Sequence, residues 1–130
     1  MTSPRILVVD DQRNWREVMH SLFTDSGYNV DTADSVDSAW KLLREETFAL
    51  AILDVRLVDK DPYDVQGVEL LEQMKERLED SFPVVIMTGY SFEGLEQILR
   101  DEYGVRAFVN KGTLEDARDF KSLVASILGS

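Results

Sequence analysis

Five short apolar runs, each followed by an amphipathic stretch, dominate this sequence of 130 residues. The runs contain few polar residues, as expected of strands that are covered on both faces of a parallel sheet. They occupy residues 5–10, 28–33, 48–53, 83–88 and 106–110, of which the second alternates more than the others. Parallel strands need crossover connections, so alternating strand and helix patterns favour an α/β fold with helices on both faces of the sheet.

The intervening stretches carry apolar residues at helical spacing. The predicted helices cover about residues 12–26, 35–43, 68–79, 91–104 and 113–127. Ser35 and Ser91 can serve as N-caps, and "TLED" (113–116) resembles a capping box. Five such units are too few for a barrel of eight, which leaves an open, doubly wound sheet of five strands. In such sheets ligands bind outside the carboxyl ends of the strands.

Composition narrows the range of partners. The net charge of −11, from 14 basic and 25 acidic residues, would repel a phosphate backbone, so we expect no direct contact with nucleic acid. The apolar runs fall far short of the roughly 20 residues that span a bilayer, and the N-terminus lacks the features of a signal peptide. We therefore expect a cytoplasmic protein without membrane contact. The length suits one domain, residues 1–130, without an effector domain.

Polar residues follow four of the predicted strands. Asp10 and Asp11 follow the first strand, Asp54 the third, Thr88 the fourth and Lys111 the fifth. A parallel sheet brings these ends to one edge, where three carboxylates cannot all stay ionised without a cation. Such an oxygen-rich cluster suits Mg²⁺ together with a phosphoryl oxygen. Lys111 and Thr88 would serve the phosphoryl group, and the central Asp54 would be the nucleophile.

Four motifs resemble, in order and spacing, the receiver domain of two-component response regulators. They are "ILVVDD", "AILDVRL", "VVIMTG" and "AFVNKG", and together they extend over essentially the whole chain. The resemblance implies a flavodoxin-like fold with strand order 2-1-3-4-5 and five helices. It implies that Asp54 is the phosphoacceptor, assisted by Thr88 and Lys111. The implied Mg²⁺ ligands are Asp10, Asp11, Asp54 and the backbone carbonyl of Arg56.

The same resemblance implies how a signal would pass through the domain. The phosphoryl group would come from a sensor histidine kinase or a phosphotransfer protein, and the domain would assist its own phosphorylation and dephosphorylation without being a turnover enzyme. Thr88 and Phe108 correspond to a switch pair that reports on the phosphoryl group. The change would appear on the face built from the fourth helix, fifth strand and fifth helix, where a downstream protein, an effector domain or a second, phosphorylated copy would dock.

Two features depart from the family pattern. The loop after Asp54 is enlarged and acidic, and it places Gly67 13 residues after the acceptor instead of about eight. Gly112 follows Lys111 where the family usually has proline preceded by a cis bond. A cis bond before a residue other than proline costs about 2.5–4 kcal/mol, so we expect a trans bond and a reshaped turn.

Other interpretations of these residues remain open. Asp10 or Asp11 could simply cap the first helix, His20 is expected at the surface or boundary, and Trp15 and Trp40 are expected to pack in or near the core. An aspartyl phosphatase would share the sheet, but it usually has a second acid two residues after the nucleophile, where Arg56 stands. The stronger alternative is a degenerate receiver that acts as a phosphate-independent interaction module.

Overall fold

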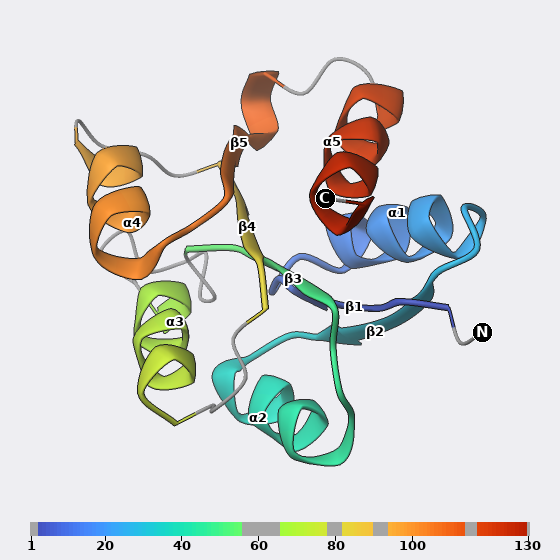
Figure 1. The fold of residues 1–130 in the computed structure, drawn as a ribbon. Coiled ribbons are helices and arrows are strands. Elements are labelled where there is room, and N and C mark those ends of the chain that lie inside the picture. Colours follow the sequence, from blue (N-terminus) through green and yellow to red (C-terminus); the bar gives the residue numbers. More distant parts are fainter. Residues whose placement is uncertain (1–2, 56–65, 78–81, 90–93, 114–116, 130) are drawn as a thin grey trace.

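A parallel sheet of five strands forms the centre of the molecule (Figure 1). The computed structural model describes residues 3–55, 66–77, 82–89, 94–113 and 117–129. The strands are β1 (Arg5–Val9), β2 (Asn29–Ala33), β3 (Leu50–Leu53), β4 (Val84–Thr88) and β5 (Ala107–Asn110). They pair in the order β2-β1-β3-β4-β5, and every pairing is parallel. This confirms the predicted doubly wound, flavodoxin-like fold.

Five helices cover the two faces of the sheet (Figure 1). They are α1 (Arg13–Thr24), α2 (Val36–Glu45), α3 (Gln66–Arg77), α4 (Leu95–Tyr103) and α5 (Ala117–Gly129), and a short 3-10 turn, η1 (Lys111–Thr113), follows β5. Helices α1 and α5 lie on one face, and α2, α3 and α4 lie on the other. Among the described residues, none of the helices has the length and apolar character needed to cross a membrane.

The core consists of two buried clusters, one on each face of the sheet. Successive side chains of a strand point to opposite faces, so Ile6 and Val8 pack under α1 and α5 while Leu7 and Val9 pack under α2, α3 and α4. All four of these side chains are at most 2% exposed. Burial on both faces is the physical reason why the strands form unbroken apolar runs in the sequence.

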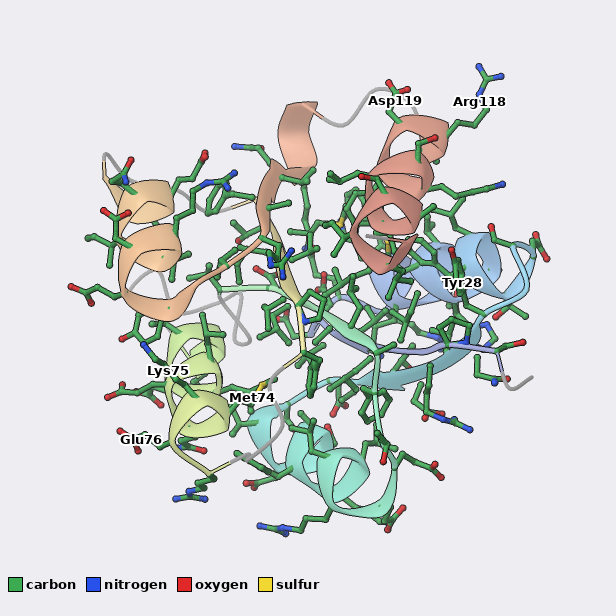
Figure 2. All side chains as sticks on the ribbon, viewed as in Figure 1. Tyr28, Met74, Lys75, Glu76, Arg118 and Asp119 are labelled. Carbon is green, nitrogen blue, oxygen red and sulfur yellow. The ribbon has the colours of Figure 1, made fainter. Side chains whose placement is uncertain are left out.

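The helices show the amphipathic pattern that the sequence predicts. In α3, Met74 is buried against the sheet, whereas the neighbouring Lys75 and Glu76 are exposed and point away from it (Figure 2). In α5, Arg118 and Asp119 project outward from the first turn of the helix (Figure 2). Each helix therefore contributes one apolar side to the core and presents charged residues to the solvent.

Helix starts agree with the sequence at α2 and differ at α4. Ser35 is the N-cap of α2, and its hydroxyl accepts a hydrogen bond from the backbone N–H of Ser38 at 3.2 Å. Helix α4 begins at Leu95 with Gly94 as its N-cap, later than the predicted start at Ser91, which lies outside the described residues. Gly94 has φ of 88°, a left-handed conformation that interrupts a right-handed helix. Residues 114–116 of the predicted capping box also lie outside the described residues.

The predicted positions of the aromatic residues and the histidine are confirmed. Trp40 is buried and its Nε1 donates to Oε1 of Gln73 at 2.8 Å, which links α2 to α3. Trp15 is partly buried against the cluster under α1 and α5. His20 is exposed on α1.

Candidate functional site

The carboxyl ends of β1 and β3 bring two aspartates together at one edge of the sheet. Val9 is paired with Leu53 in the register of these neighbouring strands, so Asp10 and Asp54 follow at equivalent positions. The backbone N–H of Asp54 donates to the carbonyl of Val9 at 2.9 Å, which extends the ladder to Asp54. Both aspartates are only 4% exposed.

Asp11 completes a cluster of three carboxylates. One carboxylate oxygen each from Asp10, Asp11 and Asp54 can be chosen so that all three lie within 4.8 Å of one another. Asp10 and Asp54 are buried, and Asp11 is half-buried. A donor set made only of carboxylate oxygens, partly open to solvent, fits Mg²⁺, which commonly takes one or two carboxylates and keeps several waters. The chemistry of these residues therefore fits the predicted cation.

Lys111 places a positive charge beside this cluster. Its Nζ lies 2.6 Å from Oδ2 of Asp10 and 2.9 Å from Oδ2 of Asp54, and its side chain is 6% exposed. The lysine comes from the start of η1, so it reaches from the end of β5 across the edge of the sheet. The ammonium thus bridges two of the three carboxylates.

Burial has a larger effect on the pKa of Asp10 than the ion pair with Lys111 has. Desolvation raises the pKa of Asp10 from 3.8 to about 6, although hydrogen bonds from Lys111 and from the backbone N–H of Gln12 lower it. The negative charge of Asp54 also contributes to this raised pKa, and the positive charge of Lys111 acts against it. The short Lys111 contact therefore only partly offsets the free energy lost when the Asp10 carboxylate leaves water.

Thr88 holds the other oxygen of Asp54. Its Oγ1 donates to Oδ1 of Asp54 at 2.6 Å, and the threonine is fully buried at the end of β4. Asp54 therefore has one oxygen at a hydroxyl and the other at an ammonium. This arrangement fixes the orientation of the carboxylate and places a hydrogen-bond donor and a cation where negative charge would accumulate in a reaction at Asp54.

The peptide bond after Lys111 is trans, as predicted. The backbone N–H of Gly112 donates to Oδ1 of Asn110 at 2.8 Å, and this bond cannot form with proline, which has no N–H. Lys111 nevertheless reaches the carboxylates.

Gly67 packs against the backbone of Asp54, a contact that the sequence did not predict. A Cβ atom at Gly67 would lie 1.8 Å from the carbonyl oxygen of Asp54, far closer than any real contact. The backbone N–H of Gly67 also donates to the carbonyl of Val55 at 2.9 Å. The start of α3 thus packs directly on the Asp54 segment. The available signal in the sequence was a glycine just before the predicted helix 68–79, at an unusual distance from Asp54.

Gln12, the N-cap of α1, and Trp15, in the first turn of α1, also contact Lys111. The sequence did not predict these contacts. Lys111 Nζ donates to Oε1 of Gln12 at 3.0 Å. The same atom lies 5.2 Å from the centroid of the Trp15 ring. The signal in the sequence was that Gln12 directly follows the aspartate pair and that Trp15 stands three residues later.

The remaining predicted residues lie as follows. Phe108 is partly buried against the cluster under α2, α3 and α4, and it pairs with Ile86 in the sheet. Because Ile86 and Thr88 are two residues apart on β4, Thr88 and Phe108 belong to the same face. Arg56 lies outside the described residues, so its carbonyl stays a predicted ligand.

This fold and site define an α/β domain with an acidic pocket at the carboxyl edge of its sheet, and the comparisons with known proteins agree. The model of the response regulator receiver domain matches residues 6–123. The transcriptional regulatory protein ZraR of Escherichia coli (strain K12) is 38% identical over 86 residues, which are 66% of this chain and 18% of that protein. The sporulation initiation phosphotransferase F of Bacillus subtilis is 27% identical over 119 residues, covering 92% of this chain and 91% of that protein.

A solved structure shows the same fold. The response regulator TrrA of Thermotoga maritima, in complex with Mg²⁺-BeF, superposes with a TM-score of 0.75 at 26% identity, covering 95% of this chain and 98% of that one.

The chain belongs to the response regulator receiver domain family. Receiver domains are signalling domains of two-component systems and not classical enzymes; they bind Mg²⁺ at an acidic pocket and interact with histidine kinases and downstream effector domains. The chain spans about a fifth of the length of the ZraR proteins that it matches.

Proposed function

We propose that Asp54 accepts a phosphoryl group from a phosphohistidine of a sensor kinase or phosphotransfer protein. The observation that carries this proposal is the Asp54 carboxylate held between the Thr88 hydroxyl and the Lys111 ammonium, beside Asp10 and Asp11. These two groups orient the carboxylate of Asp54. The Lys111 ammonium is already placed to neutralise the negative charge of a phosphoryl group that reaches the site.

The transfer follows from these positions. An oxygen of Asp54 forms a bond to phosphorus while the P–N bond of the phosphohistidine breaks, and the imidazole keeps the electron pair of that bond. Lys111 turns its ammonium from the carboxylates to a phosphoryl oxygen, and the Thr88 hydroxyl turns from Oδ1 of Asp54 to another. Asp10, Asp11, Asp54 and the carbonyl of Arg56 would hold Mg²⁺, which supplies charge neutralisation at the phosphoryl oxygens.

The output would be a shift between two conformations of the domain. The Thr88 hydroxyl is hydrogen-bonded to Oδ1 of Asp54 before phosphorylation, and in the proposed transfer it turns to a phosphoryl oxygen. Phe108, on the same face of the sheet, would move into the space behind the displaced threonine. The change would reach partners through α4, β5 and α5, over about residues 91–128.

The partners follow from the same proposal. Upstream is a histidine kinase or a phosphotransfer protein, and downstream is a protein partner, an effector domain or a second phosphorylated copy. The names of the relatives include both a transcriptional regulatory protein and a phosphotransferase, so both kinds of output occur among similar proteins.

Intact-mass spectrometry tests the proposal. The protein is incubated with acetyl phosphate and Mg²⁺, alongside a sample with EDTA and an Asp54→Asn variant. We expect one added phosphoryl group, present with Mg²⁺ and absent from both controls. If no adduct forms and beryllofluoride also fails to bind, the domain is a phosphate-independent interaction module.

A further inference from the structure

We propose that Gln12 and Trp15 are positioning residues that hold the Lys111 ammonium in place for the phosphoryl group. The inference deepens the proposed function and rests on it. Among the described residues, four groups contact Nζ of Lys111: the carboxylates of Asp10 and Asp54, the amide oxygen of Gln12 and the ring of Trp15. Two of these groups are charged and two are neutral, and the two neutral groups come from the N-terminal end of α1.

The placement of Gln12 is specific to this contact. Gln12 occupies the N-cap of α1, a position that favours Ser, Thr, Asp and Asn, and within the described residues its side chain makes no capping hydrogen bond. The amide oxygen instead accepts from Lys111 at 3.0 Å. The backbone N–H of Gln12 donates to Oδ1 of Asp10 at 2.9 Å, so a single residue contacts both the lysine and its carboxylate partner.

Trp15 supports the lysine from a fixed platform. Its ring is partly buried against the core cluster under α1 and α5, which limits how far it can move. The distance of 5.2 Å from Nζ to the ring centroid lies within the roughly 6 Å at which an ammonium is attracted to an aromatic face. Gln12 and Trp15 are three residues apart at the start of a helix and therefore lie on the same side of it.

The neutrality of these two groups matters for the reaction. When a cation and a phosphoryl group occupy the site, the carboxylates of Asp10 and Asp54 acquire other partners, and Lys111 loses its two ionic contacts. An amide oxygen and an aromatic ring still attract the ammonium at that stage. Because neither carries a negative charge, neither repels the phosphoryl oxygens.

The Gln12→Glu variant tests whether Gln12 must be neutral to position the lysine or needs only to attract it. The variant keeps the size of the side chain and binds the ammonium more strongly, but it adds a negative charge next to the phosphoryl position. We therefore expect Gln12→Glu to weaken beryllofluoride binding by about tenfold or more, and Gln12→Ala by about fivefold. An attraction-only role for Gln12 would instead make the glutamate variant bind at least as well as the wild type.

The experiment measures beryllofluoride affinity at saturating Mg²⁺ by fluorine NMR, which does not depend on tryptophan emission. Trp15→Leu should weaken binding by about fivefold, whereas Trp15→Phe, which keeps a ring, should retain most of the affinity. Mg²⁺ affinity, measured without beryllofluoride, should stay within about twofold of the wild type in Gln12→Ala and Trp15→Leu. A general loss of structure would lower both affinities.

Each substitution is repeated in a Lys111→Met background. The effects of Gln12→Ala and Trp15→Leu should disappear there, because both residues act through the lysine. Losses that persist without the lysine, or unchanged affinity in the single variants, would overturn the inference. If Trp15→Leu fails to fold, Trp15→Phe and the Gln12 pair decide the question. A wild-type protein that neither binds beryllofluoride nor takes up a phosphoryl group would instead refute the proposed function.

Discussion

Replacing Asp10 with asparagine should stabilise the protein in the absence of divalent cations. Asp10 is 4% exposed, and its burial raises the pKa from 3.8 to about 6. The folded state therefore binds this proton more tightly than the unfolded chain does. Asparagine has nearly the shape of the protonated carboxyl group and stays neutral, so it avoids the desolvation of a charge while its oxygen can still accept the N–H of Gln12.

The pH dependence gives the size of the effect. The ionised carboxylate destabilises the fold increasingly as the pH rises from about 4 to about 6, and above this window the loss is constant. The difference between 3.8 and about 6 corresponds to about 3 kcal/mol. The variant should therefore exceed the wild type in free energy of unfolding by about 3 kcal/mol at pH 7.5 and by about 1 kcal/mol at pH 4.5.

Urea denaturation in EDTA at these two pH values measures the difference. Asp25→Asn, at an exposed position at the end of α1, is the matched control and should change stability by no more than about 0.5 kcal/mol. Saturating Mg²⁺ should reduce the difference in free energy of unfolding between the variant and the wild type. The ion stabilises the wild type more, because only the wild type keeps all three carboxylates. A variant equal to or less stable than the wild type at pH 7.5 would refute the reasoning that burial outweighs the Lys111 ion pair.

Three further substitutions test other contacts of the fold and the site. Gly67→Ala should lower the free energy of unfolding by about 2 kcal/mol or more, seen in urea denaturation, because the new Cβ would collide with the Asp54 carbonyl; an unchanged value would contradict this contact. Thr88→Val removes the hydroxyl that holds Asp54 and should slow phosphorylation by acetyl phosphate, timed by intact mass; an unaltered rate would show that the hydroxyl is dispensable. Ser35→Ala should cost about 1 kcal/mol without altering that rate, and a changed rate would mean that α2 is coupled to the site.

The fold could be predicted because its strands are buried on both faces. Ile6, Leu7, Val8 and Val9 alternate between two clusters, so the strand gives a continuous apolar run that is hard to confuse with an amphipathic helix. The start of α4 could not be placed, because it depends on the left-handed backbone of Gly94, which the sequence permits without requiring.

The site was predictable only as far as topology determines it. The rule that parallel strands end at one edge was enough to bring Asp10, Asp54, Thr88 and Lys111 together. The contact between Gln12 and Lys111 joins residues 99 positions apart and depends on side-chain reach, which no periodicity reports. Likewise, Gly67 was recognised only by its unusual spacing from Asp54, whereas its packing on the Asp54 backbone appears only in three dimensions.

The most direct test of the central claim locates the phosphoryl group among the three carboxylates. After incubation with acetyl phosphate and Mg²⁺, borohydride reduces an acyl phosphate to the corresponding alcohol, and peptide mass spectrometry identifies the reduced position. We predict homoserine at position 54 and unmodified aspartates at positions 10 and 11. Modification at position 10 or 11, or at none of the three, would contradict the assignment of Asp54 as the phosphoacceptor.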